Sequence, residues 1–352
     1  MGAEDPNMVG GGVSGDVIVT VTLNAALNVT YTAEGFAAGH LNPVSRPRYR
    51  AGGRGVTVAR VLRSFGHDVL AAGLAGGVSG ELLRDDLARS GVPTAFTLIR
   101  GESRRLFRFA SPEPASPEPA SPEPASPAPD GPQLRFGEPG PYITTEELGR
   151  FAADYRALLG GAAAIVLCGS LPDGLPADTY GSLVTYAVEA GVPVILDAGG
   201  EELKHAIGHG PGLVVAETGS AGLDQGATLL RLGAGTAAVA APDRVQVVTA
   251  DAEWTARLAP SPVSSSPVSS SPGNPSPSTQ NPGGLARGAL VAGLVPGYLL
   301  GWSWPDRLRH ALALAAGAWT HLPGEPGGRD HVDLDTYEQL LEAVLVEPKQ
   351  TA

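Results

Sequence analysis

Apolar runs with strand spacing and helix spacing alternate along this chain, and this alternation constrains its fold most strongly. Residues 16–23 are rich in β-branched side chains, which favours a central strand. A helical run follows residues 52–55 and stops at Gly66, and a strand run at 68–74 precedes a helical run at 80–90. The pattern predicts an α/β fold with a mostly parallel sheet covered by helices on both faces.

The same alternation resumes in the second half of the chain. Thr144 followed three residues later by Glu147 forms a capping-box pattern and predicts a helix to residue 159. The further expected strands are 163–167, 192–197, 213–215, 236–241 and 245–249, and the further expected helices are 177–190, 304–316 and 335–346. We expect the strand at 245–249 to complete the sheet.

Two low-complexity tracts interrupt the pattern, a Pro-rich one at 110–132 and a Ser/Pro-rich one at 260–280. Neither can bury enough apolar surface to offset chain entropy, so both are predicted to be extended insertions. The Gly-rich residues 1–15 are predicted to be a disordered tail, and residues 16–346 a single domain.

Short polar and apolar pieces around 31–50 and 100–138 predict small exposed strands apart from the main sheet. The runs at 106–109 and 134–136 flank the Pro-rich tract. We expect them to form a hairpin whose tip is that tract.

Bulk composition excludes several classes of function. A net charge of −12 argues against a nucleic-acid or anionic-membrane partner. The single Cys168 excludes a disulfide framework and fits a cytoplasmic location. The apolar run 288–304 is interrupted by Pro296, so we expect a buried core helix and no membrane span. The histidines show no metal-ligand spacing, and no metal site is predicted from them.

The stretch 281–301 begins N-P-G-G-L-A-R-G and continues as a small, apolar helical run. A Gly-rich turn before a buried helix can form an anion hole, because the first backbone N–H groups of a helix are unpaired. No Asp or Glu occurs between Glu253 and Asp306, so a carboxylate base must come from elsewhere in the fold. The predicted anion hole comprises Gly284, Leu285, Ala286 and Arg287.

Seven blocks occur in an order typical of one family, at 22–31, 51–62, 101–105, 137–141, 169–180, 196–200 and 281–293. Together they resemble the ribokinase-like PfkB carbohydrate kinases, in the branch that contains 1-phosphofructokinase and tagatose-6-phosphate kinase. The resemblance implies a ribokinase-like sandwich with a small β-sheet lid. It also implies ATP and Mg²⁺ as cofactors, a phosphorylated sugar as ligand and a homodimer formed through the lid.

In kinases of this family the turn before the final helix ends in an Asp that takes the proton from the sugar hydroxyl. Alignment on Asn281 and Gly284 places Arg287 at that position, whereas alignment on 291–293 places Gly288 there. Neither residue can act as a base, because a guanidinium stays protonated and Gly has no side chain. Loss of a general base typically costs ~10²–10⁴-fold in rate.

The resemblance also implies substrate-binding roles for five residues, Asn28, Gly53, Arg54, Thr57 and Arg104. Asn28 stands where the family has an Asp, while Arg54 and Thr57 replace a Lys and an Asn. Arg54 and Arg104 keep cations where the phosphosugar branch would hold phosphate, and Arg suits bidentate phosphate contacts.

The nucleotide side departs further from the family pattern. Residues 214–220 lack the Lys, Asn and Glu of the family motif, and A-A-P-D-R-V at 240–245 replaces a Gly-rich loop. ATP and Mg²⁺ are therefore expected from the family but are not supported by these motifs.

Three functional hypotheses follow. The favoured one is an inactive or impaired pseudokinase that still binds a phosphosugar or another small anion. The second is an active phosphosugar kinase with a displaced base, for which Glu138 and Asp197 are the candidates. The third is a non-enzymatic interaction protein whose Pro/Ser tracts bind partners.

Overall fold

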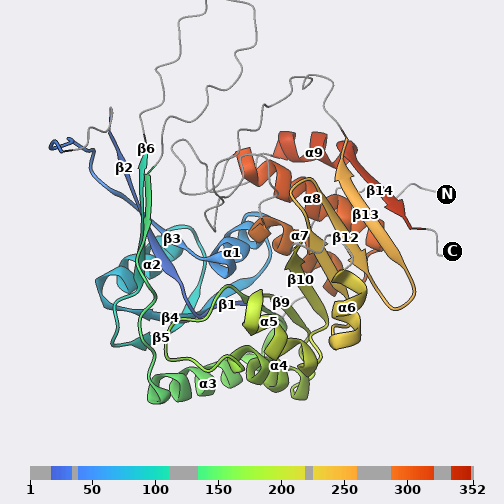
Figure 1. Ribbon diagram of the computed structural model, residues 1–352, viewed down its shortest axis with the longest axis horizontal. Helices are drawn as coiled ribbons and strands as arrows, with labels where there is room; N and C mark the ends of the chain where they lie inside the picture. Colours follow the sequence, from blue (N-terminus) through green and yellow to red (C-terminus); the bar gives the residue numbers. More distant parts are fainter. Residues whose placement is uncertain are drawn as a thin grey trace, which may run out of the picture.

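The computed structural model describes residues 17–33, 39–110, 134–218, 225–259, 287–320 and 334–349. The tail at 1–15 and the bulk of both low-complexity tracts lie outside these ranges. Within them the chain forms one large sheet, one small sheet and helices that cover the large sheet (Figure 1).

The large sheet has ten strands in the order β14-β13-β12-β11-β10-β9-β8-β1-β4-β5. Its strands from β11 through β5 in this order run parallel, and β12, β13 and β14 are added antiparallel. The strands are β1 (Val17–Thr22), β4 (Val69–Gly76), β5 (Thr94–Ile99), β8 (Ala162–Cys168), β9 (Val194–Asp197), β10 (Leu213–Glu217), β11 (Ala237–Ala240), β12 (Arg244–Val248), β13 (Glu253–Leu258) and β14 (Val344–Pro348). The central strands are almost wholly buried, as expected for a parallel sheet covered on both faces.

Helices cover both faces of this sheet and create two apolar cores (Figure 1). One face carries α1 (Arg54–Ser64), α2 (Gly77–Arg89), α7 (Arg287–Leu299), α8 (Trp304–Thr320) and α9 (Leu334–Ala343). The other carries α3 (Thr145–Leu159), α4 (Thr179–Glu189), α5 (Gly200–Ala206), η1 (Ile207–His209) and α6 (Gln225–Leu232). The predicted α/β architecture is confirmed, and the Thr144–Glu147 capping box is present at the start of α3.

Helix α7 is the buried helix expected from the apolar run at 288–304. Residues 288–297 are all buried, and Pro296 lies inside the helix. No helix in the described part of the chain is long and apolar enough to cross a membrane.

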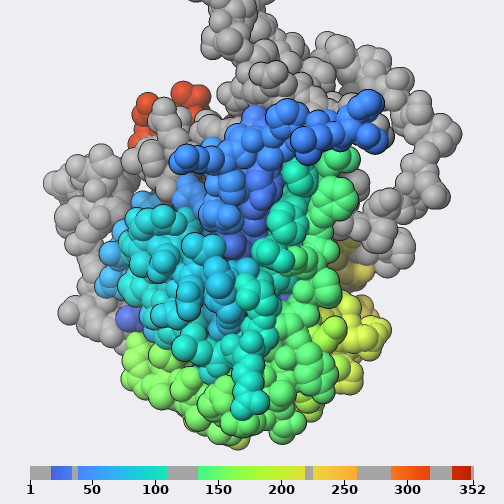
Figure 2. All heavy atoms as spheres, turned by 90° about the vertical axis from the view of Figure 1, so that its left-hand side faces the viewer, coloured from blue at the N-terminus to red at the C-terminus, as the bar shows by residue number. Residues whose placement is uncertain are grey.

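The small sheet stands beside the large one and has the order β3-β2-β6-β7. Its strands are β2 (Ala26–Thr32), β3 (Arg48–Gly52), β6 (Arg104–Ala110) and β7 (Leu134–Gly137). Strands β6 and β7 pair antiparallel, with Phe107 opposite Phe136, so the expected hairpin forms. In Figure 2 the atoms of this sheet form the blue to green region above α2.

Two expectations about the C-terminal third were wrong. The large sheet does not end at residue 249, because β13 and β14 extend it. The last helix ends at Ala343, and the chain continues as β14 where the helix was predicted to reach residue 346. The apolar run at 344–346 pairs with β13 and buries Val344 in the core, so tertiary pairing overrides the local helical pattern.

Candidate functional site at the start of helix α7

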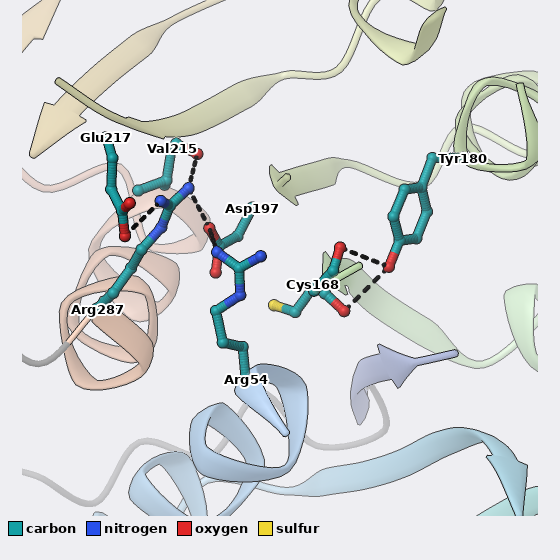
Figure 3. Close-up of polar contacts among 8 residues, drawn as sticks. Arg54, Cys168, Tyr180, Asp197, Val215, Glu217 and Arg287 are labelled. Carbon is teal, nitrogen blue, oxygen red and sulfur yellow. Dashed lines mark hydrogen bonds and ion pairs between the residues drawn. The ribbon is translucent and has the colours of Figure 1, made fainter. Parts of the chain in front are cut away.

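The candidate site lies where parallel strands β8, β9 and β10 end and helices α1 and α7 begin. Asp197 is the last residue of β9, and Glu217 is the last residue of β10. In open α/β sheets, ligands bind at the carboxyl ends of such strands. Arg54 and Arg287 are the first residues of α1 and α7, and both point toward Asp197 (Figure 3).

Asp197 is a fully buried carboxylate held by two guanidinium groups. Its Oδ1 atom lies 2.5 Å from Nη2 of Arg287 and 3.3 Å from Nη1 of Arg54. Its Oδ2 atom is buried and has no hydrogen-bond partner among the described residues. A buried carboxylate is tolerated only when it is paired, and the two arginines provide that pairing.

Arg287 links two strand ends through three polar contacts. Besides Asp197, its Nη1 atom lies 2.9 Å from Oε1 of Glu217, and Nη2 donates to the carbonyl of Val215 at 2.8 Å. Its side chain is 10% exposed. Burial alone would lower the pKa of Arg287, but the charges of Asp197 and Glu217 outweigh burial and raise it. Arg287 is therefore a permanent cation with a structural network around it.

The same pairing acts on Glu217. Burial opposes ionisation of this carboxyl group, but the charge and hydrogen bond of Arg287 lower its pKa below the ordinary value. Glu217 remains ionised at neutral pH. It was not singled out from the sequence, although its place at the end of a predicted strand could have marked it.

The two alternatives for the predicted base position face different parts of the fold. Arg287 faces the carboxylates of β9 and β10, whereas Gly288 faces α1. A Cβ atom at position 288 would lie 2.8 Å from Cγ2 of Thr57, so a side chain there requires Thr57 to move. Gly284, Leu285 and Ala286, the other predicted anion-hole residues, lie outside the described residues.

The predicted substrate residues fall on the small sheet and the start of α1. Asn28 lies on β2, directly opposite Arg50 of β3. Gly53 is the N-cap of α1 with a φ of 118°, a left-handed conformation that favours glycine. Thr57 donates its hydroxyl to the Gly53 carbonyl at 3.3 Å, which ties it to the first turn of α1.

Arg104 begins β6 and reaches the turn between β1 and β2. Its Nε atom donates to the Asn24 carbonyl at 3.2 Å, and burial lowers its pKa. Asn24 in turn donates to Oγ of Ser170 at 3.3 Å, while its own Oδ1 atom is buried without a partner among the described residues. Asn24 and Ser170 were not predicted as site residues, although both lie in blocks that carry the family resemblance.

The loop that carries Ser170 is fixed from the opposite side of the sheet. The fully buried hydroxyl of Tyr180 on α4 lies 3.0 Å from the Cys168 carbonyl and 3.2 Å from the Gly169 carbonyl (Figure 3). Tyr180 thereby anchors the end of β8 next to the candidate site. Its role depends on a contact across the fold and could not be read from local sequence.

Glu138, the other candidate for a displaced base, is engaged elsewhere. Its carboxylate accepts from Nε and Nη2 of Arg105 at 2.9 Å and 2.6 Å, and these hydrogen bonds lower its pKa. Because neighbouring strand residues point to opposite faces, Arg105 lies on the other face of the small sheet from Arg104. Glu138 therefore does not join the group around Asp197.

The described residues do not fit the Mg²⁺ and ATP that the family implies. Mg²⁺ is held by carboxylate oxygens, but Asp197 and Glu217 face guanidinium groups. Within the described ranges, no three His, Cys, Asp or Glu side chains are grouped as metal ligands. At the predicted nucleotide loop, Ala241 donates to the Arg244 carbonyl at 2.8 Å and closes a tight turn between β11 and β12.

Part of this chain is similar to known proteins. Residues 19–110 match the model of the pfkB family of carbohydrate kinases. The chain is 31% identical over 191 residues to a tagatose-6-phosphate kinase of Staphylococcus epidermidis. That alignment covers 54% of this chain and 56% of the relative, so the match spans about half of the relative's length.

Solved structures share the fold over nearly the whole chain. A putative phosphofructokinase from Staphylococcus aureus has a TM-score of 0.69 at 19% identity, covering 96% of this chain and 100% of that one. Phosphofructokinase-2 from Escherichia coli, in a form described as tetrameric and inhibited, has a TM-score of 0.72 at 21% identity, covering 93% and 98%. At these identities the likeness concerns the fold alone.

Proposed function

We propose, from the premise that this chain carries a pfkB family carbohydrate kinase domain, that it is a phosphosugar kinase homologue with impaired phosphoryl transfer. Phosphoryl transfer depends on positioning, on electrostatic stabilisation and on a group that accepts the proton of the attacking hydroxyl. The start of α7 retains a cation but offers no proton acceptor at residues 287 and 288.

One observation carries this proposal. Arg287 is buried and bonded to Asp197, Glu217 and the Val215 carbonyl, so its guanidinium is part of the scaffold. The raised pKa of Arg287 keeps this guanidinium protonated, so it is unable to act as a base. The lowered pKa of Glu217 makes this carboxylate a weak proton acceptor at neutral pH.

We assign to the site a phosphorylated sugar or another small anion as ligand. Arg54 and Arg104 support this, because they bring cations to the ends of β8 and β9 and to the start of the small sheet. The Arg54 side chain is 34% exposed, and its Nη1 atom pairs with Asp197. A guanidinium has five N–H donors, so Arg54 has further donors for a phosphate. A cytoplasmic location and the loss of Mg²⁺ and ATP binding belong to the same proposal.

The test restores an acid at each alternative position and measures transfer from Mg-ATP to fructose 1-phosphate, fructose 6-phosphate and tagatose 6-phosphate. Gly288→Asp is best made together with Thr57→Ser. The Thr57→Ser substitution removes the Cγ2 methyl group that a side chain at position 288 would meet. Arg287→Asp is the companion variant, although it places a third carboxylate beside Asp197 and Glu217. Turnover near ordinary kinase rates, ~1 s⁻¹ or more, in the unaltered protein would refute the proposal.

A second candidate is an active kinase that uses Asp197 as base. The observation in its favour is the buried Oδ2 atom of Asp197, which has no partner in the described residues. If this candidate is correct, Asp197→Asn abolishes a measurable activity and Glu138→Gln leaves it intact. Equal activity in both variants and the unaltered protein rejects it.

We further propose that two copies of the chain associate through the small sheet. The register places Tyr49, Val29, Phe107 and Phe136 in one row across β3, β2, β6 and β7. Val29 is buried in the core and Phe107 packs against it, so the exposed part of the row lies at its outer strands. Phe136 is 57% exposed and the neighbouring Leu134 is 43% exposed. Exposed aromatic and aliphatic side chains on one sheet face are typical of protein interfaces.

A further inference from the structure

We propose that the cavity between β3 and α2 binds a small oxyanion of the phosphate class, at a site distinct from the start of α7. The cavity has a volume of about 360 Å³. It is lined by Arg48, Tyr49, Arg50, Asp86, Arg89 and Ser90. Strand β3 and helix α2 lie together on the face turned to the viewer in Figure 2, where α2 is cyan.

Asp86 organises the wall of this cavity. The buried carboxylate accepts the backbone N–H of Ala51 at 2.7 Å and forms an ion pair with the buried Arg60. The first contact holds the edge strand β3 against α2, and the second compensates the charge of Asp86. Both are made by Oδ2, so this oxygen is fully engaged inside the protein.

The arginines on the cavity side stand farther from Asp86. Nη1 of Arg50 lies 3.5 Å and Nη2 of Arg89 lies 3.6 Å from Oδ1 of Asp86. Both distances are within ion-pair range but exceed the usual length of an N–H···O hydrogen bond. Arg48 completes the lining from the exposed end of β3.

The charge count of the lining favours an anion. Arg48, Arg50 and Arg89 contribute three positive charges, and the charge of Asp86, the carboxylate among the lining residues, is already matched by Arg60. Arg89 also complements the C-terminal dipole of α2, but Arg48 and Arg50 come from a strand and have no such role. Convergent guanidinium groups are suited to the several acceptor oxygens of a phosphate.

The location suggests a connection to the candidate site without depending on it. Strand β3 ends at Gly52, and the chain continues directly into Gly53 and Arg54 of α1. An anion that joins β3 to α2 would therefore stabilise the segment that presents Arg54. The proposal stands on the cavity and its charges, whatever the α7 site does.

The experiment is isothermal titration of the full chain with inorganic phosphate at low ionic strength. Arg48→Gln combined with Arg89→Gln removes two cations at exposed positions, and we expect affinity to fall roughly tenfold for each guanidinium removed. Arg309→Gln, which alters an exposed arginine paired with Asp306 on α8, is the matched control and should bind phosphate as the unaltered protein does. The melting temperature of each variant shows whether it is folded.

Arg104→Gln separates this site from the proposed phosphosugar site. The test is therefore made in the Arg104→Gln background. Phosphate binding that survives Arg104→Gln and falls when Arg48→Gln and Arg89→Gln are added supports the β3–α2 site. Phosphate affinity and stoichiometry that are unchanged by Arg48→Gln and Arg89→Gln, or an absence of phosphate binding in the unaltered protein, overturn it. A titration with fructose 1-phosphate reports on Arg104 and on the proposed function, so either proposal can fail alone.

Discussion

At the scale of single residues, the main feature of the candidate site is a buried cation, Arg287, at a position where pfkB-type kinases have a base. Desolvation of Arg287 and Asp197 is costly, and the contacts to Glu217, Arg54 and the Val215 carbonyl offset that cost. A buried ion pair adds little net stability, but removal of one partner leaves an uncompensated charge. The network therefore constrains substitutions at Arg287 strongly.

Arg287→Met should destabilise the protein by about 3 kcal/mol, because it removes one of the two arginines that pair with the fully buried Asp197 and leaves Arg54. Adding Asp197→Asn to Arg287→Met should recover part of the lost free energy of unfolding, since it removes the buried charge of Asp197. Urea unfolding of the single and double variants measures both effects. The exposed pair Arg309 and Asp306 is the control, and Arg309→Met should cost less than about 1 kcal/mol. A similar small cost for Arg287→Met would contradict the assignment.

At the scale of elements, close helix crossings explain the many small residues of α7. A Cβ atom at Gly293 would lie 2.5 Å from the Cα atom of Ala311 on α8, and one at Gly288 would meet Thr57 on α1. The backbone of α7 thus lies close to α1 at Gly288 and close to α8 at Gly293, because glycine has no Cβ atom. The sequence predicts a buried helix here. Its contacts with α1 and α8 could not be predicted, because they depend on how distant parts of the chain pack together.

Gly293→Ala should destabilise the protein by roughly 1–3 kcal/mol, because the new methyl group meets backbone that cannot move locally. Gly149→Ala is the matched control inside helix α3, where a Cβ atom meets nothing within 4 Å. That change should stabilise the protein by up to about 1 kcal/mol through helix propensity. Thermal unfolding of the two variants compares them. Equal shifts in the same direction would show that the α7–α8 crossing is looser than described.

The contact between α8 and α9 predicts a pH dependence. His310 on α8 shares a hydrogen bond with the Tyr337 hydroxyl on α9, and burial lowers its pKa from 6.5 to about 4. Between these values the unfolded chain binds more protons, so stability is complete above pH 6.5 and falls as pH drops toward 4. The loss attributable to His310 amounts to about 3 kcal/mol at most.

Urea unfolding at pH 7.5 and pH 5 checks this expectation. The decrease between the two pH values should be smaller in His310→Asn, which keeps a polar partner for Tyr337 but does not titrate. The same decrease in both proteins would exclude His310 as the cause.

The elements also show what local sequence can and cannot predict. The β-branched run of β1, the apolar run of β8 and the capping box of α3 are local sequence signals, so these elements were predicted close to their observed bounds. Strand β14 was predicted as helix because its pairing partner β13 lies about ninety residues earlier. Arg287 was identified from its motif. Its partner Glu217 was not identified, because the two residues are far apart in the sequence and meet in the folded chain.

At the scale of the whole molecule, the small sheet presents opposite properties on its two faces. One carries Asn28 and Arg104, and the other carries the row that includes Phe107 and Phe136. The β2 part of that second face, with Leu27 and Val29, is packed into the core. Stacked Tyr31 and Phe109 rings, with centroids 5.3 Å apart, extend the second face. The exposed apolar side chains Leu134 and Phe136 of β7 mark the part of the second face that we propose for contact with a second copy of the chain.

Phe136→Asp should shift the protein from dimer to monomer, because it places a charge in the proposed apolar contact. Sedimentation velocity at micromolar concentration measures the change. Leu41→Asp is the control, since this 96% exposed apolar residue lies outside the strands of the small sheet. A monomeric unaltered protein, or a dimer that tolerates Phe136→Asp, would contradict this interface.

We propose above all that residues 287 and 288 at the start of α7 offer no base, because Arg287 cannot accept the proton of the sugar hydroxyl. The most direct measurement is the turnover of purified protein, at high enzyme concentration, with Mg-ATP and each of the three hexose phosphates. Loss of a base lowers ordinary kinase rates by ~10²–10⁴-fold, so we predict ~10⁻² s⁻¹ or less for every sugar phosphate. A turnover of ~1 s⁻¹ or more with any of them would contradict the account.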